Sequence, residues 1–210
     1  MKVTKEQAQQ NRQALLDAAG RLFKKHGIDG IGVAEVSREA GLTPGALYKH
    51  FADKQDLAAQ AFSHAFRQGF DRVNAPRPGA ERDVATYLKA YLNPRRRDDL
   101  EAGCPLIATA CETGRQGEQL SQSFAEAFVE FRAGVESVLP DTMDAAQRAA
   151  LASVFVAAFV GANAISRGVV KADRALADEV LDQVRGVLAS LAPTPGGAEP
   201  GAPSPESEPR

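Results

Sequence analysis

The apolar positions of this chain recur every three or four residues, which is the spacing of helices that bury one face. Alternating strand patterns are nearly absent, so we predict an all-α fold. Thr4 and Gln7 have the spacing of a capping box at the start of the first helix, and Gly27 predicts its end, directly after His26. The apolar stripe of this helix is Leu15, Ala18, Ala19, Leu22 and Phe23.

Two short helices and a longer one are predicted next. The second helix is expected to end at Gly41. Thr43 and Pro44 signal the start of a third helix, because threonine caps well and proline needs no N–H in the first turn. We expect this third helix to end near His50. Asp53 then predicts the cap of a fourth helix, whose apolar positions are Leu57, Ala61, Phe62, Ala65 and Phe66.

Five further helices are predicted after a break at residues 74–80. They lie near 81–93, 105–115, 118–138, 143–168 and 173–191, which makes about nine helices in all. Thr142 and Asp173 are the expected caps of the last two. Six of the twelve prolines fall in residues 193–210, which lack large apolar side chains, and we predict a disordered Pro/Gly-rich tail there.

Composition restricts the class of protein. The chain has 210 residues, 44% of them apolar and 25% charged, which suits one large domain or a small domain joined to a larger one. The longest apolar run, residues 149–165, is shorter than the ~20 residues of a membrane span, so we expect a buried helix there. The N-terminal segment lacks the apolar core of a signal peptide, and we expect a cytoplasmic protein.

The residue types that usually form a catalytic or metal site are not clustered in the sequence. His26, His50 and His64 have no metal-ligand spacing, and no phosphate-binding loop is present. We therefore expect neither an enzyme nor a cofactor, although a catalytic site assembled only in three dimensions stays an alternative.

Charge is unevenly distributed along the chain. Residues 1–55 carry nine Lys and Arg against six Asp and Glu, a net charge of +3, and the remainder carries 16 against 21, a net charge of −5. A uniformly basic nucleic-acid coat is thereby excluded, but the positive part of the chain contains the segment described next.

The stretch "VAEVSREAGLTPGALYKHF", residues 33–51, fits the pattern of a helix-turn-helix. Gly41 allows the tight turn, and Leu42 and Leu47 would hold the second helix against the first. The residues left outside are Thr43, Gly45, Ala46, Tyr48, Lys49 and His50.

This outer set suits the major groove of DNA. Small Gly45 and Ala46 would permit close approach to base edges. The side chains at 48–50 carry donors for phosphate oxygens. Lys54 begins the next helix, where a cation opposes the helix dipole unless an external anion lies nearby. Because such a motif can also be plain scaffolding, a helical protein-interaction module without DNA binding stays an alternative.

Residues 15–62, "LLDAAGRLFKKHGIDGIGVAEVSREAGLTPGALYKHFADKQDLAAQAF", resemble the DNA-binding segment of the tetracycline-repressor (TetR) family of transcriptional regulators. The resemblance implies a homodimer in which an N-terminal three-helix unit, here 1–55, binds DNA. A larger helical domain, here 56–192, would dimerise and bind an effector. By position, the DNA contacts of the family fall on Thr43, Gly45, Ala46, Tyr48, Lys49, His50 and Lys54, with Arg38 a lesser candidate. Residues 91–113, "YLNPRRRDDLEAGCPLIATACET", are similar to a "GCP" subgroup of TetR-like regulators. This similarity does not identify the effector.

The last two predicted helices carry the expected dimer interface. Each has an apolar stripe, and two such helices from each subunit would form a four-helix interface. The stripes are Leu151, Phe155, Ala158, Ala162 and Ile165, and Leu176, Val180, Val184, Val187 and Leu191. Packing of both helices within one subunit is the alternative.

An effector cavity between the helices would be lined mainly by aromatic side chains. The candidates are Phe62, Phe66, Tyr87, Tyr91, Phe124, Phe128, Phe155 and Phe159, each of which also suits a packed core. Asn163 is the polar candidate, because a buried amide needs a partner. Cys104 and Cys111 are too far apart on one helix for a disulfide, but both are candidate redox residues. Cys104 is the first choice, because a helix N-terminus stabilises a thiolate.

Together these features predict a ligand-responsive regulator, most simply a repressor that a small molecule releases from a palindromic operator. A sensor of electrophiles or oxidants that uses Cys104 is the alternative within the same class.

Overall fold

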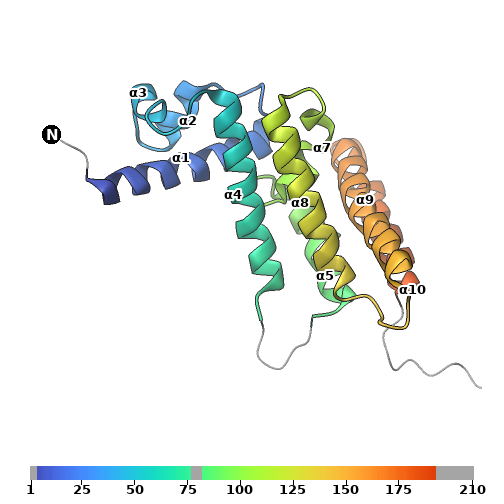
Figure 1. The fold of residues 1–210 in the computed structure, drawn as a ribbon. Coiled ribbons are helices and arrows are strands. Elements are labelled where there is room, and N and C mark those ends of the chain that lie inside the picture. Colours follow the sequence, from blue (N-terminus) through green and yellow to red (C-terminus); the bar gives the residue numbers. More distant parts are fainter. Residues whose placement is uncertain (1–3, 77–81, 193–210) are drawn as a thin grey trace, which may run out of the picture.

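A computed structural model describes residues 4–76 and 82–192, which form helices and no strand (Figure 1). The predicted all-α fold is confirmed. The helices are α1 (Lys5–His26), α2 (Val33–Glu39), α3 (Pro44–Leu47), α4 (Lys54–Asn74), α5 (Val84–Tyr91), α6 (Pro94–Asp98), α7 (Pro105–Thr113), α8 (Glu118–Glu136), α9 (Ala145–Val169) and α10 (Arg174–Leu191). The tail predicted at 193–210 lies outside the described residues.

Side-chain caps begin several of these helices where the sequence predicts them. Thr4, Asp53 and Asp173 each accept a hydrogen bond from the backbone N–H three residues on, at 2.9–3.1 Å. Gly27 ends α1 with φ +80°, a conformation that glycine adopts without strain.

The number of helices and the cap of α9 differ from the prediction. The described residues contain ten helices rather than about nine, because α6 was missed: it has five residues, too few to show a helical period. Asn93 caps it, and Pro94 occupies its first position. The cap of α9 is Asp144, not Thr142, because the chain first makes a turn in which Met143 N–H donates to Pro140 O at 3.2 Å.

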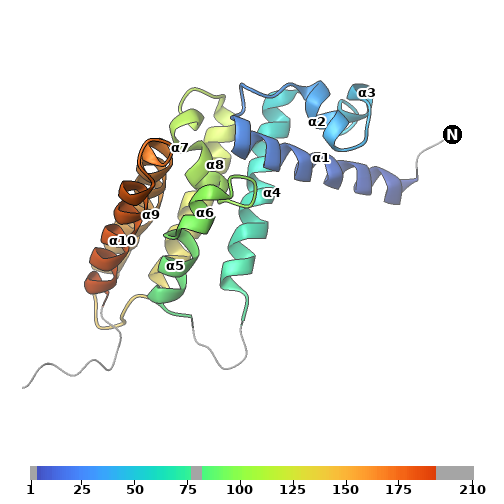
Figure 2. The same cartoon turned by 180° about the vertical axis from the view of Figure 1, so that it is seen from behind.

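The helices are arranged in two parts joined by α4. In Figure 1, α1 crosses α4 near its upper end, and α2 and α3 lie above α1. Helix α8 runs beside α4. Helices α9 and α10 form a pair at the opposite end from α3, and the view from behind shows α5 and α6 between that pair and α4 (Figure 2). Helix α7 packs against α1, α4, α8 and α9, so it touches both parts.

Among the described residues, α9 alone is long and apolar enough to cross a membrane. Buried helices of soluble proteins pass the same test, and α9 packs against α7, α8 and α10. Within the subunit 39% of its apolar window is buried, and Val154 and Ile165 remain exposed.

A buried arginine ties α6 to the C-terminal pair of helices. Arg97 is 1% exposed, and its guanidinium donates to Asp98 at 2.8 Å, to Asp178 on α10 and to Ser166 on α9. Hydrogen bonds from Arg97 and Arg174 lower the pKa of Asp98 to about 2, so this carboxylate stays charged at neutral pH. The network fixes the position of α6 and of the neighbouring Arg96.

Candidate nucleic-acid interface and internal cavity

The turn between α2 and α3 has the geometry of a helix-turn-helix. Gly41 has φ +69°, and the Leu42 N–H donates to Ser37 O at 2.8 Å, which reverses the chain. Val36 and Leu47 are both fully buried, and Phe51 closes the same cluster at 2% exposure. The anchors of the motif are thus inside, although Leu42 is only partly buried.

Helix α3 is shorter than predicted: it ends at Leu47 rather than near His50. Beyond it the chain tightens, since the N–H groups of Lys49 and His50 donate to the carbonyls three residues earlier at 3.3 and 2.9 Å. The Phe51 N–H still donates to Leu47 O at 3.1 Å, so Leu47 and Phe51 lie on the same face, and both are buried.

The residues predicted to contact DNA gather on one surface around α3. Thr43, Gly45, Tyr48, Lys49 and Arg38 are exposed, whereas Ala46, His50 and Lys54 are half-buried. The Tyr48 side chain is 55% exposed, which is unusual for an aromatic ring that has no outside partner. Nothing lies within 4 Å of the position that a Gly45 Cβ would occupy, so packing within the subunit does not require glycine there.

The cations of this surface are available to an anion. No ion pair within the described residues involves Lys49 or Lys54. Arg38 lies 3.8 Å from Glu35, with its side chain 79% exposed. Lys54 is held at the start of α4, because the Asp53 cap and the Ala52 N–H bond to Asp56 at 2.9 Å fix that turn. The surface thus presents the ammonium groups of Lys49 and Lys54 near Gly45, which has no side chain.

A carboxylate on α7 holds the C-terminal end of α1. Glu112 accepts hydrogen bonds from the N–H groups of Ile28 at 2.7 Å and Asp29 at 3.3 Å. A Cβ at Gly27 would lie 3.1 Å from the same carboxylate, so glycine leaves room for it. Lys24 donates to Gly103 O at 3.1 Å, just before α7. The two parts of the molecule are therefore joined through α7 as well as through α4.

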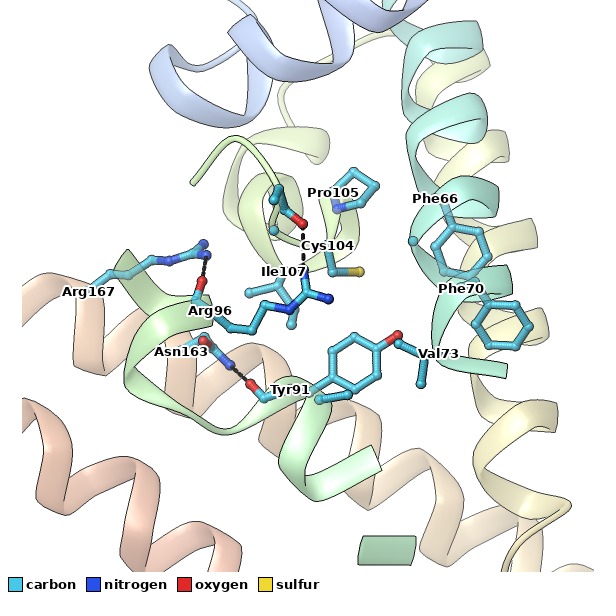
Figure 3. A pocket seen from close by; sticks show the side chains of 14 residues that line it. Phe66, Phe70, Val73, Tyr91, Arg96, Cys104, Pro105, Ile107, Asn163 and Arg167 are labelled. Atoms are coloured by element: carbon cyan, nitrogen blue, oxygen red, sulfur yellow. Dashed lines mark hydrogen bonds between the residues drawn. The ribbon is translucent and has the colours of Figure 1, made fainter. Parts of the chain in front are cut away.

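An internal cavity lies directly below this junction, between α4, the α5–α6 segment, the start of α7 and α9 (Figure 3). It encloses about 440 Å³ with its mouth included, but the space open to the centres of water-sized spheres is about 20 Å³, room for about one water. Its walls include Phe66, Phe70, Val73, Tyr91 and Ile107. The cavity is apolar and narrow as it stands.

Few of the predicted effector residues line this cavity. Phe66, Tyr91 and Asn163 do, whereas Tyr87, Phe124, Phe128, Phe155 and Phe159 do not, and Phe62 lines a separate narrow crevice next to α1. Most of these rings pack on one another: Tyr91 and Phe131 have ring centroids 4.7 Å apart. The Asn163 amide is 1% exposed and donates to Tyr91 O and Phe159 O, both at 2.8 Å.

Two basic side chains of the cavity, Arg96 and Arg167, are not among the residues predicted from the sequence. The run of three arginines at 95–97 includes Arg96, but the run does not indicate which of the three points into the protein. Arg95 is exposed, Arg96 is half-buried and Arg97 is fully buried.

The two cysteines differ in their surroundings. Cys104 is the N-cap of α7 and lines the cavity, while Cys111 is exposed. Burial raises the pKa of the Cys104 thiol, and this outweighs hydrogen bonds from the N–H groups of Ile107 and Leu106. The thiol is therefore held in its neutral form, which does not favour a reactive thiolate. Within the described residues no group of His, Cys, Asp and Glu could hold a metal ion.

The predicted dimer residues divide between the core and the surface. Phe155 and Ala162 are buried within the subunit, and Leu151, Ala158, Val180 and Val184 are half-buried. The exposed members are Ile165 (56%), Leu176 (44%), Val187 (60%) and Leu191 (46%), joined on α9 by Val154 (52%). Five of the seven large exposed apolar side chains of the described residues thus lie on α9 and α10.

Comparisons with known proteins agree with this architecture. Residues 15–61 match the family model of bacterial regulatory proteins, tetR family, and residues 81–179 match that of the LmrA/YxaF-like transcriptional regulator C-terminal domain. The HTH-type transcriptional regulator LmrA of Bacillus subtilis (strain 168) is 31% identical over 156 residues, 71% of this chain and 82% of LmrA. The HTH-type transcriptional regulator AcrR of Shigella flexneri is 46% identical over 57 residues, which cover 27% of this chain and only 26% of AcrR.

Solved structures of similar shape belong to the same class. A TetR transcriptional regulator from Legionella pneumophila superposes with a TM-score of 0.72 at 14% identity, covering 86% of this chain and 96% of that one. A TetR transcriptional regulator from Chloroflexus aurantiacus J-10-FL gives 0.70 at 22% identity, covering 88% and 95%. At these identities the likeness concerns the fold.

The Glu112 contact generates a stability prediction. Glu112→Ala should lower the free energy of unfolding by about 1–3 kcal/mol, because the buried Ile28 N–H loses its acceptor. Urea denaturation measures the loss, and amide hydrogen exchange at Ile28 should become faster. Glu130→Ala, on the exposed face of α8, is the control and should change neither quantity. Unchanged exchange at Ile28 would show that the contact does not hold the end of α1.

Proposed function

This chain belongs to the TetR family of bacterial regulatory proteins, and from that premise we propose that it is a cytoplasmic repressor that a small molecule releases from DNA. Regulators of this family act as dimers and bind DNA operators. The observation that carries the proposal is the exposed surface around α3, with its bare Gly45, its outward Tyr48 and its unpaired lysines.

In the proposed complex α3 enters the major groove. Gly45 and Ala46 face base edges, and Thr43 and Tyr48 contact bases or phosphate oxygens. The cations Arg38, Lys49, His50 and Lys54 lie around them and neutralise phosphates. The unit that does this is the proposed domain 1–55, which shares α4 with the regulatory domain 56–192.

A dimer built on α9 and α10 would present two copies of α3. The exposed apolar side chains of these helices support the proposal, because burying them between subunits removes them from water. Two-fold symmetry then selects a roughly palindromic operator with half-sites about 34–36 Å apart.

The proposed release mechanism uses α4 and α7. Helix α4 begins at Lys54 on the DNA-binding surface and supplies Phe66, Gly69, Phe70 and Val73 to the cavity. Helix α7 starts at the cavity and holds α1 through Glu112. A molecule that widens the cavity displaces both helices, and therefore weakens DNA binding by the same factor by which DNA weakens binding of the molecule.

The phosphate contacts predict a defined salt dependence. With DNA from upstream of the protein's own gene, Lys49→Ala and Lys54→Ala should each weaken binding and reduce the slope of log K against log salt by roughly one. Fluorescence anisotropy at several salt concentrations measures both quantities. Lys89→Ala, on α5 at the far end of the molecule, is the matched control and should leave them unchanged (Figure 2). A slope that stays constant in the two variants would remove these lysines from the interface.

The open space at Gly45 predicts a variant that separates stability from binding. Gly45→Leu should fold with an unchanged melting temperature, because its exposed position has no atom within 4 Å of the added Cβ. It should weaken DNA binding by about 1–3 kcal/mol, or roughly 5- to 150-fold, by keeping α3 away from base edges. Gly45→Ala adds a single methyl and should have the smaller effect of the two. Full affinity in Gly45→Leu would mean that α3 does not approach DNA closely.

The dimer interface is tested by charge. The double variant Leu176→Glu, Val187→Glu should be monomeric by light scattering, because four carboxylates would have to be buried in each dimer. Val129→Glu, equally exposed but on α8, should leave the dimer intact. Dimers that persist in the double variant would place the interface elsewhere.

A further inference from the structure

Four basic side chains surround the loop that leads into α7. Arg96 and Arg167 line the internal cavity, and Lys24 and Arg72 line a wider cleft next to it, of about 880 Å³ with its mouth included. The two hollows share Gly69, Ala102 and Gly103, so they meet at this loop. The loop is therefore approached by cations from α1, α4, α6 and α9.

These cations have no carboxylate partner within the described residues. Arg96 donates to Ala102 O at 2.7 Å, Arg167 donates to the carbonyls of Arg97 and Arg96 at 3.2 and 3.5 Å, and Lys24 donates to Gly103 O. Two nearby carboxylates are used elsewhere. Asp99 accepts from the Ala102 N–H at 2.9 Å, and Glu101 pairs with Lys25 at 2.5 Å.

Such an arrangement is unfavourable without an anion. Arg72 is exposed, but Lys24, Arg96 and Arg167 are half-buried. Partly buried cations in proteins are usually paired, because a carbonyl oxygen offsets only part of the lost hydration. Burial lowers the pKa of Lys24 and of Arg167, and for Lys24 it outweighs the raising effect of the Asp99 carboxylate. Each guanidinium also has five N–H donors, but Arg96 bonds to one carbonyl and Arg167 to two.

The cavity beside these cations is apolar and contains one buried amide. Figure 3 shows the Arg96 guanidinium reaching into the middle of the cavity, between Cys104 and the Tyr91 ring. Phe66 and Phe70 form the opposite wall. No described residue donates to the Oδ1 atom of the buried Asn163, so this oxygen is left for a donor in the cavity.

We propose that the cavity binds an organic anion with a flat apolar body, and that this class of molecule is the effector of the proposed regulator. Its carboxylate or sulfonate group pairs with Arg96, with Arg167 close by, and its body packs against Phe66, Phe70 and Tyr91. This inference rests on the proposed function for its regulatory meaning, but the binding site itself does not depend on DNA binding.

The same contact connects binding to release of DNA. Arg96 bonds to Ala102 O in the narrow cavity, and Ala102 lies just before α7. An anion that takes the Arg96 guanidinium competes for that hydrogen bond, and its body needs more space than the cavity now offers. The start of α7 therefore moves, and with it the Glu112 carboxylate that holds α1.

Two dyes that differ in charge test the proposal. 8-Anilinonaphthalene-1-sulfonate and N-phenyl-1-naphthylamine share an apolar body, but only the first carries a sulfonate. By fluorescence titration of the full chain, Arg96→Gln and Arg167→Gln should each weaken the anionic dye about tenfold or more, since charge-assisted hydrogen bonds are lost. The affinity of the neutral dye should change less than about twofold. Arg115→Gln, an exposed arginine beyond the end of α7, is the control and should change neither.

Every other pattern overturns the anion site. Equal affinity of the anionic dye in all variants means that the arginines do not bind it, and an equal loss for both dyes means that they only support the cavity. Saturable binding of neither dye removes the site itself.

A parallel anisotropy titration with DNA separates this inference from the proposed function. If the protein binds DNA but the dyes fail, the regulator stands and the anion site falls. If the dyes behave as expected but no DNA binds, the site stands and the proposed function falls. Release of DNA by the anionic dye in the native protein and not in Arg96→Gln supports both.

Discussion

The burial of Leu47 is the constraint on which the rest of the structure depends. A helix of four residues has no stability of its own, so packing alone sets the orientation of α3. Leu47 lies with Val36 and Phe51 in a cluster that has almost no exposed area, and Gly41 supplies the reversal that makes this possible. Once Leu47 points inward, the bare glycine, the tyrosine and the lysine around it must point outward. The surface that we assign to DNA is thus a consequence of one buried side chain.

The second constraint is that this surface cannot move independently of the cavity. Helix α4 runs from the DNA-binding surface to the cavity wall, and the Glu112 carboxylate on α7 completes the hydrogen bonding at the end of α1. The loop before α7 is bonded to Arg96 and Lys24, which lack carboxylate partners. A ligand that neutralises these buried charges would therefore act on the part of the chain that also fixes α1. In the proposed mechanism, regulation and DNA binding share the same few contacts.

How far the sequence predicts this structure depends on whether a feature is local. Caps such as Thr4, Asp53 and Asp173, and the turn at Gly41, use neighbouring residues only, and the structure has them where they are expected. Features that depend on distant partners were missed: in the run 95–97 one arginine is exposed, one is half-buried and one is fully buried, which is decided by α9 and α10. For the same reason most aromatic candidates for the effector site do not line the internal cavity, since helical spacing says that a ring is buried but not whether its neighbour is a side chain or a void.

The most direct test of the central claim is a structure of the protein bound to its operator DNA. The account predicts a two-fold symmetric complex in which both copies of α3 lie in the major groove, about 34–36 Å apart, with Gly45 against base edges and Lys49 and Lys54 at phosphates. A complex in which α3 faces solvent, or in which another helix occupies the groove, would contradict it.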